Sequence, residues 1–168
     1  MTPRDVLAEA ILQTKALTAR YLAGFDESSR TRQAAGLPNH VAWSLGHCAL
    51  TMHRVAQKVD GREPPPVDFA AGTPGAFNPE SVAFGSVPAD GAAYPSLARC
   101  TGVFDAACDR LAAAVRAASD TQLMQPIPWG NTQAPWWTLV TRMVFHNGFH
   151  TGQIADLRRA LGFKSVFS

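Results

Sequence analysis

Apolar residues recur every three or four positions in four separate stretches of the chain, which is the spacing of one face of an α-helix. We find no alternation of apolar and polar residues with the period of two that is typical of a β-strand. We expect four helices, which run from Pro3 to a stop at Gly24, from Asn39 to Gly61, from about Ser96 to Ala118, and from near Pro135 to Leu161. The pattern therefore predicts an all-α domain, and four amphipathic helices close most naturally as a four-helix bundle.

Residues that favour helix ends support these limits. Thr2 is expected to cap the first helix, with Pro3 in the first helical position. Asp5, three residues after Thr2, makes a near capping box with Thr2. Asn39 is a good N-cap for the second helix, and Gly162 closes the fourth. The apolar face of the first helix is expected at Leu7, Ala10, Thr14, Leu17 and Tyr21, flanked by Ile11 and Thr18.

The connection between the second and third helices, residues 62–95, is long and irregular. It is rich in proline and glycine, which excludes a long helix. Four aromatic residues punctuate it, namely Phe69, Phe77, Phe84 and Tyr94, so we expect it to pack over the domain. Two roles stay open for it, the wall of a pocket and a crossover without chemistry. Residues 25–38 and 119–134 are interpreted as ordinary connections.

Composition and charge narrow the functional classes. The chain has 168 residues, 46% of them hydrophobic, and a formal net charge of +2, which together predict one globular domain over residues 1–168. So small a charge, without a basic patch, argues against a nucleic-acid partner. We see no signal peptide and no apolar run that could span a bilayer, so we expect no membrane partner and a cytoplasmic location. Cys48, Cys100 and Cys108 are interpreted as buried free thiols, with ligation or redox chemistry as the alternative.

The apolar face of the fourth predicted helix contains two histidines, His146 and His150. They are four residues apart, so both imidazoles lie on one face and can reach one ion. A catalytic metal usually has three protein ligands, and His40, His47 and His53 are the candidates for the third. We choose His47, because His40 lies two turns earlier and His53 points to another side of the helix, where we expect it to be solvated.

The spacing of the pair resembles half of a zincin motif, but Asn147 stands where that motif has its glutamate, so a peptidase of that class is set aside. Three neutral nitrogens suit Zn or Ni best, with Fe, Co or Mn as further choices. Gln153, one turn after His150, is a candidate to orient a ligand or a bound water, or else a helix-packing amide. Thr151 and Asp156 are weaker candidates for the same role. The alternative to a metal is a buried hydrogen-bonded histidine network.

Two segments resemble signatures of the DinB/YfiT-like superfamily. These are Asn39-His-Val-Ala-Trp43-Ser-Leu-Gly-His47 and His146-Asn-Gly-Phe-His150-Thr-Gly-Gln153-Ile, the second followed by Leu157-Arg-Arg-Ala-Leu-Gly162. The resemblance covers essentially the whole chain except residues 62–95. It implies an up-down-down-up four-helix bundle, and the family's three metal ligands fall on His47, His146 and His150.

The same resemblance implies a metal-dependent thiol S-transferase, in which a low-molecular-weight thiol is the co-substrate and a small molecule is the acceptor. Mycothiol-dependent isomerases of the same superfamily also activate a thiol at the metal. Hydrolysis by metal-activated water is a second reaction class that the resemblance allows. The alternative is a stress-response protein that binds a metal and a small ligand without turnover. Members of the family are often homodimers. Trp43, Trp137 and Phe149 are expected either to line an apolar substrate pocket or to lie in the core.

Overall fold

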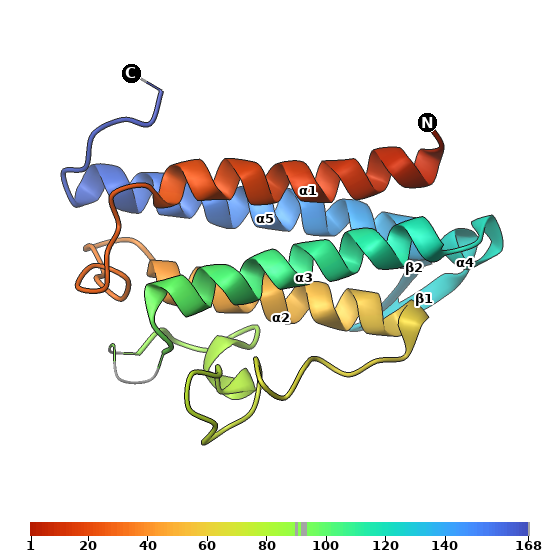
Figure 1. Cartoon of the computed structure of the whole chain (residues 1–168), viewed down its shortest axis with the longest axis horizontal. Coiled ribbons are helices and arrows are strands. Elements are labelled where there is room, and N and C mark those ends of the chain that lie inside the picture. The colour runs from red at the N-terminus through yellow and green to blue at the C-terminus, as the bar shows by residue number, and fades with distance from the viewer. Residues whose placement is uncertain (90, 92–93, 168) are drawn as a thin grey trace.

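Four long helices lie side by side in the computed structural model, which describes residues 1–89, 91 and 94–167 (Figure 1). They are α1 (Pro3–Leu22), α2 (Val41–Asp60), α3 (Leu97–Ala117) and α5 (Trp136–Ala160). Helices α1 and α2 each contact both α3 and α5. The molecule is therefore mostly helical, as the periodicity predicts, and the predicted limits of the four helices are close to the observed ones.

The capping chemistry of the helices matches the prediction with one exception. The Thr2 side chain accepts from the backbone N–H of Asp5, whose carboxylate accepts in return from the backbone of Thr2, so the capping box is complete. The predicted N-cap Asn39 of the second helix is wrong. His40 takes that position, and its Nδ1 accepts from the backbone N–H of Trp43 at 3.1 Å. An imidazole can cap because its unprotonated nitrogen accepts a hydrogen bond, as a serine oxygen does.

The buried face of α1 is rotated from the expected one toward its flanking residues. Leu17 is 45% exposed, whereas Ala8, Ile11 and Thr18 are buried. Thr18 pairs with Thr151 of α5 through their hydroxyls at 2.7 Å. The positions of the apolar residues do not locate the buried face of α1, because a threonine whose hydroxyl is hydrogen-bonded can be buried where a leucine is exposed.

A short helix and a two-stranded antiparallel sheet occupy the connection before α5, so the expectation of no strands is wrong. Helix α4 (Asp120–Met124) is followed by β1 (Pro126–Trp129) and β2 (Thr132–Pro135). The strands have only four residues each and contain three prolines, which hides the alternation. The signal that could have revealed them is the two-residue Gly130-Asn131 turn, in which Gly130 has φ +56°.

The long connection between α2 and α3 packs against α2 (Figure 1). It contains a 3₁₀ helix, η1 (Pro79–Val82), and a bridge between Phe69 and Phe77. Phe77 is fully buried and its ring lies directly on Gly46 of α2. A Cβ at Gly46 would come within 2.5 Å of that ring, so the absence of a side chain at position 46 is what allows the connection to approach α2 so closely.

His53, the third histidine along the chain, is buried, which corrects the expectation that it is solvated. It is 1% exposed, and its Nδ1 lies 3.0 Å from Nη1 of Arg110, which also pairs with Asp60. Burial, aided by the charge of Arg110, lowers the pKa of His53 to about 4, so the ring is neutral and accepts from the guanidinium. His53 therefore contributes to the packing of α2 against α3.

The three cysteines are free and buried, as predicted. Burial raises the pKa of Cys100 and of Cys108 to about 12 and raises that of Cys48 well above its usual range. All three thiols are therefore protonated near neutral pH. In the described part of the chain, no helix combines the length and the apolar composition needed to cross a membrane.

We predict that Gly46→Ala destabilises the protein by about 1–3 kcal/mol, because the new methyl group overpacks the Phe77 ring. The matched control is Gly102→Ala in α3, where nothing lies within 4 Å of the added Cβ, and there we expect a gain of up to about 1 kcal/mol from helix propensity. Urea denaturation measures both free energies of unfolding.

If the clash with Phe77 is the cause, the cost of Gly46→Ala should shrink in a Phe77→Leu background. An equal cost in both backgrounds would show that Gly46 is required for another reason.

Candidate metal centre

Three histidines from two helices meet where α2 and α5 pack against each other. His47 comes from α2, and His146 and His150 lie one turn apart on α5. One ring nitrogen of each lies within 4.8 Å of a ring nitrogen of the other two, so the group could hold a metal ion. The Nε2 atoms of His47 and His146 are 3.1 Å apart. Two nitrogens bound to one tetrahedral zinc are roughly 3.3 Å apart, so this pair already has ligand spacing.

Backbone and side-chain acceptors fix the tautomers of two of the rings. The Nδ1–H of His47 donates to the carbonyl oxygen of Val82 at 2.8 Å, since a carbonyl can only accept. The Nδ1–H of His150 donates to Oε1 of Gln153 at 2.8 Å, and that oxygen also accepts from Nδ2 of Asn39 at 2.9 Å. Both rings therefore present a bare Nε2 lone pair, which is the form that binds a metal.

The third ring, His146, is less constrained. Its Nε2 faces His47, while its buried Nδ1 has no hydrogen-bond partner among the described residues. His146 is half-buried, whereas His47 and His150 are 5% and 6% exposed. The expectation that both rings of the α5 pair lie in the core therefore holds for His150 only, and His146 sits at the edge that faces a cavity.

All three imidazoles are neutral near neutral pH. Burial, together with the His150 and His47 rings beside it, lowers the pKa of His146 to about 3. Burial and His47 lower the pKa of His150 to about 4, against the effect of the hydrogen bond to Gln153. Burial also lowers the pKa of His47, which the hydrogen bond to Val82 opposes. Because metal ions bind the unprotonated ring, this environment favours ligation over protonation.

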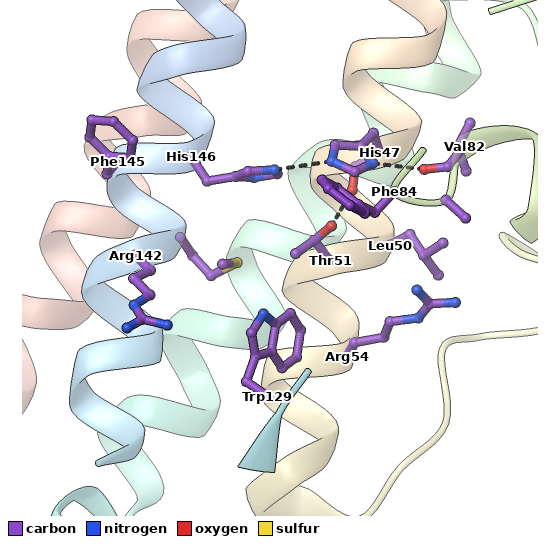
Figure 2. A pocket seen from close by; sticks show the side chains of 12 residues that line it. His47, Leu50, Thr51, Arg54, Val82, Phe84, Trp129, Arg142, Phe145 and His146 are labelled. Atoms are coloured by element: carbon purple, nitrogen blue, oxygen red, sulfur yellow. Dashed lines mark hydrogen bonds between the residues drawn. The ribbon is translucent and has the colours of Figure 1, made fainter. Parts of the chain in front are cut away.

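A cavity of about 480 Å³ opens beside His47 and His146. In Figure 2 the two rings face each other across the gap between α5 and α2, and Trp129 of β1 lies below them. The connection between α2 and α3 contributes Val82, Ala83 and Phe84 to the lining, which agrees with the pocket-wall role left open for it. Most of the wall is apolar, and none of its described residues is an aspartate or a glutamate.

Of the three residues predicted to orient a ligand or a bound water, only one hydrogen-bonds to a histidine of the cluster. Gln153 hydrogen-bonds His150 as the orienting role requires, whereas Thr151 pairs with Thr18 and Asp156 pairs with Arg159. The candidate orienting roles of Thr151 and Asp156 are therefore not supported by contacts. His40 caps α2 and is not part of the cluster.

None of the three aromatic candidates lines the cavity. The buried Trp43 stacks on the His47 ring at 4.6 Å and donates from Nε1 to Ser86. Phe149 is 55% exposed and meets His150 edge-on, and Trp137 lies in a separate hollow against α1 and α4.

Sequence reasoning did not find Val82 or the contact of Asn39. Val82 acts through its backbone carbonyl, which every residue has, so no residue type could have marked it. Asn39 directly precedes α2, where its side chain is equally suited to capping; only the packing of α2 against α5 directs it to Gln153.

A family model described as the DinB superfamily matches residues 10–154 of the chain. Among solved structures, a conserved protein from Enterococcus faecalis is similar, with a TM-score of 0.75 and 16% sequence identity over 95% of this chain and 97% of that chain. At this identity the likeness shows a common fold. No curated protein matches the chain.

We predict that Gln153→Ala weakens the binding of zinc or nickel by about 10–100-fold, because His150 loses the acceptor that holds its tautomer and ring orientation. Calorimetric titration of the metal-free protein measures the dissociation constant. Gln13→Ala, on the exposed face of α1, is the control and should leave the constant unchanged. Equal affinities for the wild type and Gln153→Ala would mean that Gln153 only packs the helices.

Proposed function

The chain belongs to the DinB superfamily, and from this membership and the geometry of its histidines we propose that it is a divalent-metal protein acting on a small molecule. Its ligands are His47, His146 and His150. The observation that carries the proposal is the convergence of three neutral imidazoles, two of them buried and one half-buried, from two helices beside a cavity of about 480 Å³. A cavity of that size accommodates a small organic substrate.

The donor set fits a transition metal. Two of the rings are held by acceptors at Nδ1 and offer Nε2, and His146 places its own Nε2 within 3.1 Å of that of His47. Among the residues that the structure describes, no cysteine or carboxylate belongs to the cluster. Three imidazoles suit zinc or nickel best, and iron, cobalt or manganese are further choices, whereas magnesium and calcium prefer oxygen ligands.

The chemistry that such an ion supplies is Lewis acidity, which lowers the pKa of a thiol or a water that reaches it and so generates a nucleophile near neutral pH. Three neutral ligands leave the double positive charge uncompensated, so anionic ligands are favoured. The reaction class we favour is S-transfer, in which the sulfur of a low-molecular-weight thiol bonds to an electrophilic carbon and the leaving group departs with its bonding electrons.

The cavity lining favours S-transfer over hydrolysis. Hydrolysis is usually assisted by a general base, and the described lining contains no carboxylate and no histidine besides the proposed ligands. A thiol has a much lower intrinsic pKa than water and loses its proton to solvent without that assistance. The described residues of the wall, among them Trp129, Met143 and Leu50, exclude water and pack against an apolar acceptor.

The chain's own residues hold the site in place. Trp43 stacks on His47 with an angle of 12° between the rings, which restricts rotation of that imidazole. Val82 and Gln153 keep the Nδ1 protons of His47 and His150 directed away from the other rings.

A binding protein without turnover, active in a stress response, is the alternative function. Homodimer formation and a cytoplasmic location stay predictions from the sequence.

We predict one equivalent of metal per chain, and we expect His47→Ala, His146→Ala and His150→Ala each to lose most of it, because two imidazoles hold such ions weakly. Mass spectrometry of metals measures the content, and circular dichroism shows that each variant folds. The control is His40→Asn, which keeps a side chain that caps helices and should keep the metal. A protein that takes up no metal, or alanine variants with unchanged content, would contradict the site.

The enzymatic part is tested by incubating the metal-loaded protein with a panel of small thiols and an alkylating electrophile and following the loss of free thiol. We expect loss that depends on the metal and is absent in the three alanine variants. Binding of thiol without its consumption would instead support the non-catalytic function.

A further inference from the structure

Two arginines line the cavity that contains His47 and His146, one from each of the two helices; in Figure 2 the guanidinium of Arg54 points away from Arg142. Arg54 extends from α2 and Arg142 from α5, and both line the cavity (Figure 2). Helices α2 and α5 run in opposite directions here, because His47 meets His146 while Val55 meets Trp136. Both arginines therefore lie toward the same end of the cavity, away from the histidines.

Neither arginine has a partner within the described part of the chain. No hydrogen bond or ion pair involves the side chain of Arg54 or of Arg142, whereas Arg110 is engaged with Asp60, His53 and two carbonyls. No acidic residue stands three or four positions from either arginine on its own helix. Glu63 lines a neighbouring hollow with Arg54, but its carboxylate accepts from Gln57 at 2.6 Å.

Arg54 and Arg142 are both exposed, so water solvates their charges, and their guanidinium donors are available to an anion that enters the cavity. Arginine donates through a planar fork that matches carboxylates and phosphates, and such charge-assisted hydrogen bonds are about twice as strong as neutral ones. The apolar walls near the arginines, including Trp129 and Leu50, are suited to an apolar body rather than to a free inorganic ion.

The distances along the helices set the length of the ligand. Arg142 precedes His146 by four residues and Arg54 follows His47 by seven, which corresponds to about 6 and about 10 Å along the helix axes. We propose that the cavity binds an elongated small molecule whose oxyanion is held by Arg54 and Arg142, with the exposed Arg54 side chain turning toward Arg142 on binding, and whose apolar or aromatic body packs on Trp129. Its other end then reaches His47 and His146, and only this last feature rests on the proposed function.

The test uses the metal-free protein, so that the arginines are examined without the metal centre. Calorimetry compares 4-phenylbutanoate with its uncharged analogue 4-phenylbutan-1-ol, and 4-phenylbutylphosphonate distinguishes a preference for carboxylate from one for a phosphate-like group. We expect at least one of the acids to bind about tenfold more tightly than the alcohol. In Arg54→Gln/Arg142→Gln the ratio should fall to about one, with intermediate ratios in the single variants, while the affinity for the alcohol changes little.

The control is Arg20→Gln, which removes an arginine of α1 that lies outside the cavity and makes no ion pair with a described residue. It should keep the full preference for the acid. Equal binding of acids and alcohol, a preference that survives the double variant, or an equal loss in Arg20→Gln would each overturn the proposal. A protein that prefers the acids but binds no metal would retain this inference and reject the proposed function instead.

Discussion

The site depends on three neutral imidazoles between α2 and α5, of which His47 and His150 are buried and His146 is half-buried. Desolvation makes protonation of these rings unfavourable, and their mutual proximity adds to that effect. The cluster of neutral rings is itself incompletely satisfied, since Nδ1 of His146 has no hydrogen-bond partner among the described residues and a buried polar group without one costs about 1–3 kcal/mol. A divalent cation can accept the Nε2 lone pairs of all three rings together, whereas the Nε2 contact between His47 and His146 joins only two of them, and this is the physical reason to interpret the cluster as a metal centre.

The irregular connection between α2 and α3 is part of this site. Gly46 allows Phe77 to pack on α2 one residue before His47, and this contact brings η1 close enough for the Val82 carbonyl to accept from His47. Ser86 then accepts from Trp43, which stacks on the same imidazole. A proline- and glycine-rich segment can do this because it needs no regular hydrogen-bond ladder and can direct single carbonyls and hydroxyls toward α2. The α2 side of the site is therefore held by a segment far from the α5 pair in sequence.

Much of the helical framework could be predicted because its signals are local. Apolar spacing, the capping box at Thr2 and the stop at Gly61 act over a few residues, and the His146/His150 spacing places two rings on one face. What was missed depends on tertiary contacts. The burial of His53 requires Arg110 of α3, the rotation of α1 follows from the Thr18–Thr151 pair, and the link from Asn39 to Gln153 exists only because α2 and α5 meet. Three prolines concealed the short hairpin, although its Gly130-Asn131 turn was visible.

The most direct measurement is a crystal structure of the zinc-loaded protein with anomalous scattering recorded at the zinc absorption edge. The account predicts one strong anomalous peak between α2 and α5, about 2.0–2.1 Å from Nε2 of His47, His146 and His150, with a further coordination position facing the cavity. A peak at other residues, or loaded crystals in which these imidazoles bond only to each other, would contradict it.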